Sequence, residues 1–122
     1  MRPLLFAAAF LVAVTSWPQG STPTPPVREF VVVAEKFAFT PERIEVTQGE
    51  RVRVTVRSAD TTHGWAIEAF DVDVLARKGG RPETVEFVAD RAGTFEITCS
   101  EYCGRGHKRM KGVFVVKPAG LS

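Results

Sequence analysis

The sequence predicts an all-β protein, a small sandwich in which two sheets pack face to face. The chain has 122 residues, of which 44% are hydrophobic, so it is long enough for one domain with a core of its own. From residue 28 onward, short stretches of β-branched and aromatic residues alternate with turn-forming residues. No stretch repeats its apolar residues with a helical period over a useful length. Together these observations predict seven or so short strands in a β-sandwich of about 90 residues.

The clearest strand covers residues 51–58. Val52, Val54 and Val56 alternate with arginine and threonine, which predicts a half-buried strand of an antiparallel sheet. The other strands are expected at residues 30–33, 44–46, 65–68, 72–75, 84–88, 94–98 and 113–117. Glycine and aspartate lie in several of the segments between them, so we expect tight turns there.

The first residues have the features of a secretory signal peptide. A basic residue, Arg2, precedes an apolar run of about 12 residues and then the small polar pair Thr15 and Ser16. The run is shorter than the roughly 20 residues that span a bilayer, which favours export with cleavage over a permanent anchor. The next residues are uncharged and rich in proline, serine and threonine, as in an extended tether. The predicted parts are a signal peptide or short membrane anchor (1–16), a tether (17–27), the folded domain (28–118) and a C-terminal tail (119–122).

Residues 99–110 concentrate side chains that bind metals. Two cysteines, one histidine and one methionine lie in this stretch, and His63 is the only other histidine in the chain. The alternation of residues 94–98 continues into Cys99, so the first thiol is expected on the inner side of a strand end. Thiolate, imidazole and thioether are soft or borderline ligands, which favour copper over cations that prefer oxygen. The stretch therefore predicts a copper site supported by a strand on either side.

The spacing of this stretch resembles the copper-ligand loop of the binuclear CuA centre, found in subunit II of cytochrome c oxidases and in nitrous oxide reductase. The family pattern is Cys-x-Glu/Gln-x-Cys-x-x-x-His-x-x-Met, and it is matched at every spacing by Cys99, Glu101, Cys103, His107 and Met110. The sequence from Asp60 to Trp65 is similar to the context of the family's first histidine, here His63. The resemblance covers roughly residues 30–117 and implies a cupredoxin-like Greek-key β-sandwich.

The same resemblance implies two copper ions and a set of metal ligands. The implied ligands are His63, Cys99, Glu101, Cys103, His107 and Met110. The two cysteines would be thiolates that bridge both ions, and each histidine would bind one ion through a ring nitrogen. The methionine thioether and the backbone carbonyl of Glu101 would be weak ligands, one to each ion.

The function implied is electron transfer through a CuA centre, by an exported cupredoxin or by the copper domain of an oxidase subunit II. The sequence has no nucleophile–base pair, carboxylate dyad or phosphate-binding glycine loop, so catalysis by this chain alone is not expected. In an oxidase it would be the electron-entry subunit of a haem-copper enzyme. The expected partners are a redox donor and acceptor: a cytochrome c-like protein, another cupredoxin or the oxidase catalytic subunit. The expected location is the periplasm or the outer face of the cytoplasmic membrane, with membrane contact through the N-terminal segment.

Several alternatives remain open from the sequence. The two cysteines could form a structural disulfide, or could bind zinc together with the two histidines. A periplasmic copper-binding or copper-delivery protein could use the same ligands without redox turnover, and a mononuclear blue copper site would leave one cysteine without a role. Met110 could fill a gap in the core. Trp65 is expected to pack in the core or at its rim rather than to relay electrons.

Charge excludes one class of function and points to a kind of partner. The formal net charge is +2 at neutral pH, without the basic tract typical of nucleic-acid binding. The ligand stretch itself is basic, with Arg105, Lys108, Arg109 and Lys111 against Glu101. Such a surface favours an acidic or neutral partner, unless these side chains form an ordinary solvated rim.

Overall fold

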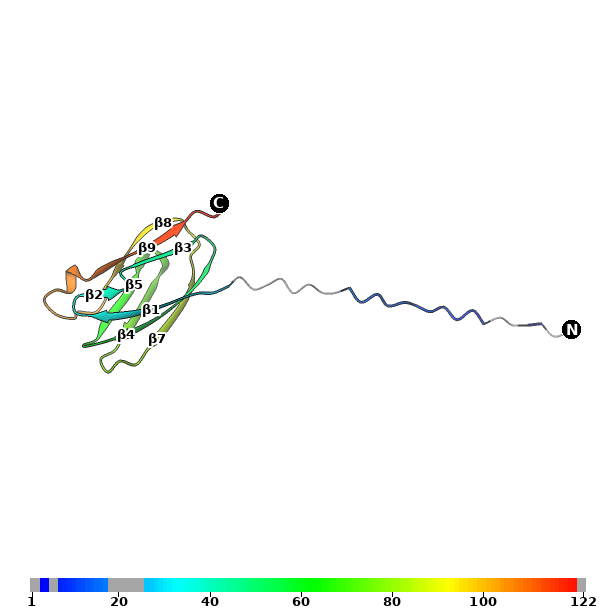
Figure 1. The fold of residues 1–122 in the computed structure, drawn as a ribbon, viewed down its shortest axis with the longest axis horizontal. Helices are drawn as coiled ribbons and strands as arrows, with labels where there is room; N and C mark the ends of the chain where they lie inside the picture. The colour runs from blue at the N-terminus through cyan, green and yellow to red at the C-terminus, as the bar shows by residue number, and fades with distance from the viewer. Residues whose placement is uncertain (1–2, 5–6, 18–25, 121–122) are drawn as a thin grey trace.

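The computed structural model describes residues 3–4, 7–17 and 26–120 (Figure 1). Within this part of the chain there are nine strands and two short 3₁₀ helices. The strands are β1 (Arg28–Glu35), β2 (Ala38–Thr40), β3 (Arg43–Thr47), β4 (Arg51–Ser58), β5 (His63–Ile67), β6 (Val72–Ala76), β7 (Glu83–Val88), β8 (Gly93–Thr98) and β9 (Lys111–Lys117). The helices are η1 (Glu68–Phe70) and η2 (His107–Arg109). The all-β prediction is confirmed, and β2 is a strand that the sequence pattern did not indicate.

The strands form two sheets that pack as a sandwich (Figure 1). One sheet has the order β2-β1-β4-β7 and the other the order β3-β9-β8-β5-β6. β4 is antiparallel to β7 but parallel to β1, so the prediction of an antiparallel sheet around residues 51–58 was wrong on one side of this strand. Parallel neighbours need a long connection. Here the chain runs from β1 through β2 and β3, which lie in different sheets, before it returns as β4.

The inner strand β4 shows how the sheets bury their apolar faces. Its inward-facing residues are Val52, Val54 and Val56, and all three are fully buried. Burial of a side chain of this size contributes about 1.5–3 kcal/mol. On the outward face of β4, Arg53 forms ion pairs with Glu29 on β1 and with Glu86 on β7. The predicted alternation along this strand therefore determines which face packs against the second sheet.

Four phenylalanines pack together toward the end of the sandwich away from residues 99–110. They are Phe70, Phe87, Phe95 and Phe114. The centroids of neighbouring rings lie 4.8–5.7 Å apart in tilted or edge-to-face arrangements, which are the favoured geometries for aromatic pairs. The guanidinium of Arg91 lies over the rings of Phe70 and Phe95, at 5.4 Å and 5.9 Å from their centroids, and the metal-binding side chains lie at the other end.

Strands β5, β8 and β9 lie side by side and position residues 99–110. Thr98 at the end of β8 pairs with Lys111 at the start of β9, so sheet pairing joins the two ends of this stretch. On the other side of β8, Ala66 of β5 pairs with Thr98. His63 is the first residue of β5 and is held by the sheet, whereas the sequence suggested a loop position for it.

Residues 7–17 lie outside the sandwich (Figure 1). Their apolar side chains are exposed, with Phe10 at 90% and Leu11 at 94% of full exposure. Among the described residues, no helix combines the length and the apolar character needed to cross a bilayer. The division of the chain at residues 16, 27 and 118 stays a prediction. Parts of the predicted leader, tether and tail lie outside the described residues.

Candidate metal site

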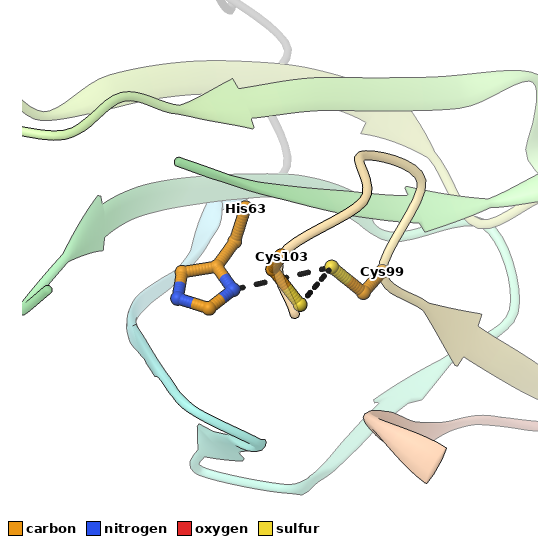
Figure 2. A group of neighbouring side chains, drawn as sticks. All are labelled: His63, Cys99 and Cys103. Atoms are coloured by element: carbon orange, nitrogen blue, oxygen red, sulfur yellow. Dashed lines mark hydrogen bonds between the residues drawn. The ribbon is translucent and has the colours of Figure 1, made fainter. Parts of the chain in front are cut away.

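Two buried thiols form the centre of the site (Figure 2). The Sγ atoms of Cys99 and Cys103 lie 3.4 Å apart, and both cysteines are free. The disulfide alternative is therefore not the state of this structure. Burial raises the pKa of the Cys103 thiol to about 12, and the neighbouring Cys99 adds to this effect. A metal ion that binds here must displace the thiol proton, because the thiolate is the ligand.

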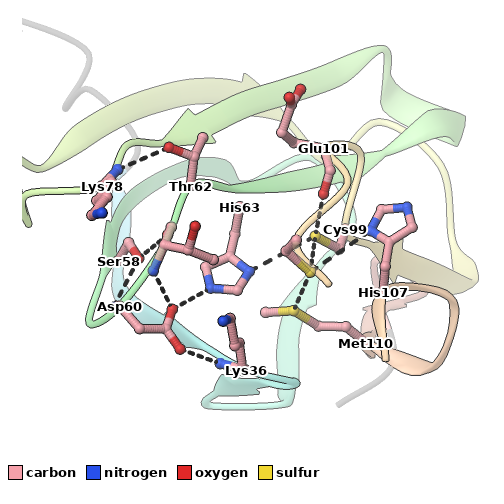
Figure 3. A network of polar contacts seen from close by, with 12 residues as sticks. Lys36, Ser58, Asp60, Thr62, His63, Lys78, Cys99, Glu101, His107 and Met110 are labelled. Carbon is pink, nitrogen blue, oxygen red and sulfur yellow. Dashed lines mark hydrogen bonds and ion pairs between the residues drawn. The ribbon is translucent and has the colours of Figure 1, made fainter. Parts of the chain in front are cut away.

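His63 flanks the thiol pair on one side. Its side chain is fully buried, and its Nδ1 atom lies 4.0 Å from the Sγ atom of Cys99. The other ring nitrogen, Nε2, lies 2.6 Å from Oδ1 of Asp60 (Figure 3). A carboxylate at that distance favours the tautomer in which Nε2 carries the proton, which leaves the Nδ1 lone pair facing the thiols. Asp60 thus orients His63 as a ligand.

The Asp60 carboxylate is itself held in place. It accepts hydrogen bonds from the backbone N–H groups of Lys36 at 2.8 Å and of Thr61 at 2.6 Å. Burial by itself would raise the pKa of Asp60, but the bonds from Lys36, His63 and Thr61 outweigh burial and lower this pKa to about 2. The group is therefore a carboxylate at neutral pH and can accept the bond from His63.

His107 flanks the thiol pair on the other side. It is the first residue of η2, and its Nδ1 atom lies 3.7 Å from the Sγ atom of Cys103. Unlike His63, this histidine is only half-buried. The exposed ring of Tyr102 lies 5.6 Å from the His107 ring, centroid to centroid. The two imidazoles therefore reach the thiols from different elements, one from the sheet and one from the loop.

Two weaker donors complete the set. The Met110 Sδ atom lies 3.8 Å from the Sγ atom of Cys103, and Met110 is fully buried. The backbone carbonyl of Glu101 accepts a hydrogen bond from the Cys99 thiol at 3.1 Å. Figure 3 shows the Glu101 carboxylate pointing away from the sulfur atoms. The structure thus brings all six predicted site residues to one place, with Glu101 present through its backbone.

The ligand stretch packs closely against two other segments, and the sequence analysis missed both contacts. A Cβ atom on Gly64 would lie 1.8 Å from Oγ and 2.8 Å from the backbone nitrogen of Ser100, so only glycine fits beside the loop. A Cβ atom on Gly106 would lie 2.4 Å from the ring of Phe37. The available signal was the glycine itself, because a glycine in a strand marks close approach of another backbone.

The fold and the arrangement of donors agree with a known family. Residues 29–117 match the family described as cytochrome c oxidase subunit II, periplasmic domain. This chain belongs to that family. The predictions of a CuA-type cupredoxin domain, of a binuclear copper cofactor and of an exported location are thereby confirmed.

Individual relatives of this subunit II domain support the assignment. The chain is 37% identical over 86 residues to cytochrome c oxidase subunit 2 of Thermus thermophilus, a match that covers 70% of this chain and 63% of that protein. The solved periplasmic domain of subunit II of cytochrome oxidase from Bradyrhizobium japonicum has a TM-score of 0.68 at 23% identity, over 80% of this chain and 88% of that one. Reduced auracyanin from Roseiflexus castenholzii has a TM-score of 0.60 at 19% identity, over 74% and 97% of the two chains. These two structures share the fold, and the chain spans less than two thirds of the curated relatives that it matches.

The donor atoms of the subunit II domain have the spacing that a small metal ion requires. Nitrogen and sulfur ligands bind such ions at about 2.0–2.3 Å, so two donors on one ion lie roughly 3–4 Å apart. Four contacts join a cysteine sulfur to another sulfur or to a histidine nitrogen, and they measure 3.4, 3.7, 3.8 and 4.0 Å. Thiolates with imidazoles and a thioether suit copper better than zinc. The residues present therefore fit the copper cofactor of the family.

Proposed function

We propose that this domain transfers single electrons through a binuclear copper centre, as the copper domain of an oxidase subunit II. When bound, the copper ions supply reversible one-electron redox chemistry. Cys99 and Cys103 would hold both ions through their thiolates, and His63 and His107 would each hold one. Met110 and the backbone carbonyl of Glu101 would be the weak ligands.

The observation that carries this proposal is the symmetry of the donors about the thiol pair. Two thiols lie 3.4 Å apart, with one imidazole Nδ1 atom 4.0 Å from the first sulfur and another 3.7 Å from the second. The thioether and the backbone carbonyl lie 3.8 Å and 3.1 Å from the thiols. A single four-coordinate ion would use the two thiols and the two imidazoles but would leave the thioether and the carbonyl without a role, whereas two ions use all six donors.

The chain supports this role by holding its donors still. Cys99 directly follows β8, Met110 directly precedes β9, and His63 begins β5, so three donors are fixed by one sheet. Asp60 fixes the ring of His63 in addition. Donors locked by packing and by hydrogen bonds keep their positions when the charge at the site changes. The buried setting of the two thiols also limits access of water.

The experiment that tests the proposal measures copper content and the electron paramagnetic resonance spectrum of the copper-loaded protein. Two copper ions per chain, with hyperfine splitting from an electron shared over two nuclei, are expected. One copper with splitting from a single nucleus would contradict the proposal and indicate a mononuclear site. Stable copper binding without a reversible wave in voltammetry would favour the copper-delivery alternative.

The predicted leader gives a second part of the proposal. Residues 1–16 would direct export, and residues 17–27 would connect the leader to the folded domain. The exposed apolar side chains of Phe10 and Leu11 support this role, because an apolar segment outside a core suits a membrane or a translocation channel. Cell fractionation with mass measurement of the isolated protein tests it. A mass lacking about 16 residues indicates cleavage at the predicted site, and a full-length mass in the membrane fraction indicates an anchor.

Partnership with a haem-copper catalytic subunit is the finer part of this proposal. Family membership supports it, and affinity purification from the native membrane tests it. Co-purification of a haem-containing subunit in constant ratio is expected for an oxidase subunit. Isolation of this chain as a free monomer would instead favour an independent electron carrier.

A further inference from the structure

The end of the sandwich that carries the metal site is positively charged. Four segments meet there: 36–42, 59–62, 77–82 and 99–110. They contain seven lysines and arginines and three carboxylates, a net charge of +4 with histidine neutral. The cations, which we call the basic end, are Lys36, Arg77, Lys78, Arg81, Arg105, Lys108 and Arg109. Their side chains are exposed.

The opposite end of the sandwich carries no such excess of positive charge. Its segments 48–50, 68–71 and 89–92 contain four carboxylates and one arginine, a net charge of −3, which Arg28, Arg51 and Lys117 at the neighbouring strand ends bring to zero. These three segments lie together, because Arg91 bonds to the backbone carbonyl of Ala69 and Gly49 bonds to that of Ala89. The positive charge of the domain is therefore concentrated at the end that carries the site.

The charge of the basic end is not neutralised within the domain. Across residues 26–120, where the folded domain is described, none of its seven cations forms an ion pair. Lys111, which the sequence analysis grouped with the basic loop, differs in this respect because it pairs with Glu96 at 3.1 Å. Unpaired, exposed cations of one sign produce a field that extends into solvent.

The site is accessible from within the basic end. Of the five proposed ligand side chains, only that of His107 is not buried. Arg105, Lys108 and Arg109 lie within two residues of it and are exposed. Tyr102, 72% exposed, adds an aromatic surface next to the His107 ring. The route from solvent to the thiols therefore passes through a rim of cations and one aromatic ring.

We infer that the surface formed by Tyr102, Arg105, Lys108 and Arg109 around His107 is the docking site for an acidic redox protein. The inference rests on the proposed electron-transfer function. Complementary charge would orient the partner toward His107 and raise the rate of encounter. An anionic membrane is the competing occupant. It is disfavoured because β1 begins at the opposite end, so the N-terminal segment leaves the domain away from the basic end (Figure 1).

Electron exchange with a matched pair of probes tests the inference. The probes are native cytochrome c, which is basic, and the same cytochrome after succinylation of its lysines, which makes it acidic. Stopped-flow mixing with the copper-loaded protein gives second-order rate constants as a function of ionic strength. With the acidic probe we expect a fall of about tenfold between low and high salt, because screening removes the attraction. With the basic probe the rate constant should rise with salt.

A triple variant tests which cations are responsible. Arg105→Gln, Lys108→Gln and Arg109→Gln together should lower the low-salt rate constant with the acidic probe and flatten its salt dependence. The control removes the same number of charges at the other end, through Arg28→Gln, Arg51→Gln and Lys117→Gln, and should keep the salt dependence. Copper content and the paramagnetic spectrum of each variant verify that the site is intact. If the triple variant fails to bind copper, the inference is tested with Lys108→Gln alone, which should also lower the low-salt rate constant with the acidic probe, and with the salt dependence of the wild type.

The outcomes separate the inference from the function on which it rests. Absence of a dicopper spectrum or of any electron exchange would overturn the proposed function itself. Electron exchange that is faster with the basic probe, or insensitive to salt with both, would overturn only the docking site. Binding to phosphatidylglycerol vesicles that is lost in the triple variant, with unchanged exchange rates, would assign the basic end to a membrane surface and overturn the inference.

Discussion

At the scale of single residues, Cys103 lies at the centre of one half of the donor set. Its thiol lies 3.4 Å from Cys99, 3.7 Å from His107 and 3.8 Å from Met110, so it contacts three other donors of the set, as many as Cys99 does. Cys99 has the complementary contacts with His63 and with the carbonyl of Glu101. Each thiol thus contacts the donors of one half of the site and lies next to the other thiol.

Replacing Cys103 should remove the binuclear centre. In Cys103→Ser one thiolate cannot supply both bridges, so we expect at most one copper with hyperfine splitting from a single nucleus. Copper analysis and electron paramagnetic resonance measure this. Met110→Leu is the matched control and should retain both ions while it shifts the reduction potential, since a weak axial ligand tunes the metal more than it anchors it. A wild-type dicopper spectrum in Cys103→Ser would refute the ligand assignment.

Gly64→Ala should displace the ligand loop. The added Cβ atom would lie 2.8 Å from the backbone nitrogen of Ser100, and backbone cannot move aside as a flexible side chain can. We expect copper affinity to fall by about tenfold or more, as with other disturbances next to a metal ligand. Competition with a chelator measures the affinity. Adding Ser100→Ala removes the closer hydroxyl contact but not the backbone contact, and complete rescue by it would contradict this explanation.

At the scale of elements, the connection between β1 and β2 packs against the ligand loop. The ring of Phe37 lies against Gly104 and Gly106; a Cβ atom on Gly104 would lie 3.1 Å from the ring, and on Gly106, at 2.4 Å, there is no room for one. This contact links the first strands of the chain to a loop about 70 residues later in the sequence. The fold therefore supports the site from both sheets, since β1 and β2 belong to one and β8 and β9 to the other.

Phe37→Ala should loosen the site more than the fold. Phe37 is only half-buried, so removing its ring should lower the free energy of unfolding by less than the roughly 3–5 kcal/mol lost when a fully buried phenylalanine is replaced by alanine. The rate of copper release to a chelator should nevertheless rise, because the loop loses its support. Phe95→Ala is the control at the other end, and it should lower the melting temperature without changing copper release. Equal release rates in Phe37→Ala and in the wild type would contradict this role.

Charged side chains that pair across β1, β4 and β7, namely Glu29, Arg51, Arg53 and Glu86, give a pH-dependent contribution to stability. The hydrogen bond from Arg51 and the pairing with Arg53 lower the pKa of Glu86. A carboxyl whose pKa is lowered by folding stabilises the protein above its ordinary pKa and loses this effect as the pH falls through the lowered value. The stability difference between Glu86→Gln and the wild type in urea should therefore shrink on acidification. High salt should also reduce it, since the pairs are exposed; a difference that grows in acid would contradict the assignment.

At the scale of the whole molecule, the fold and the metal site are partly independent. Most of the buried core residues are aliphatics and phenylalanines outside the proposed ligand set, while Cys99, Cys103 and Met110 belong to the same buried cluster; Trp65 is buried there as the sequence led us to expect. The concentration of positive charge around the site likewise comes from loop residues that lie outside the core. The surface charge can therefore be changed without changing the core.

Copper should stabilise a domain that is already folded. The apo-protein should unfold in one cooperative transition, because the core does not depend on the ligands. Copper at 1,000 times its dissociation constant should raise the free energy of unfolding by about 4 kcal/mol, since it binds the folded state alone. The melting temperature should then rise by roughly 15 °C or more. Calorimetry with and without chelator measures both; an apo-protein without a cooperative transition would show that the metal builds the fold.

The sequence by itself determined the fold class and predicted the identity of the donors. Alternation along residues 51–58 and 94–98 is a local property with a period of two, so it reveals the inward faces before any partner strand is known. The spacing of the residues from Cys99 to Met110 is equally local, and it indicated copper because these ligand types occur together. His63 was included through its sequence context, although its position at the start of a strand was not foreseen.

Only the tertiary structure decided how distant segments meet. The parallel pairing of β1 with β4, the fit of Gly64 against Ser100 and the packing of Phe37 on Gly106 join residues far apart in the chain. The concentration of seven unpaired cations at one end also appears only when four separate segments lie together. Such contacts depend on chain topology and side-chain shape, which no local period encodes. The residue types therefore identify the chemistry, and the sandwich determines the geometry and the surface through which that chemistry is reached.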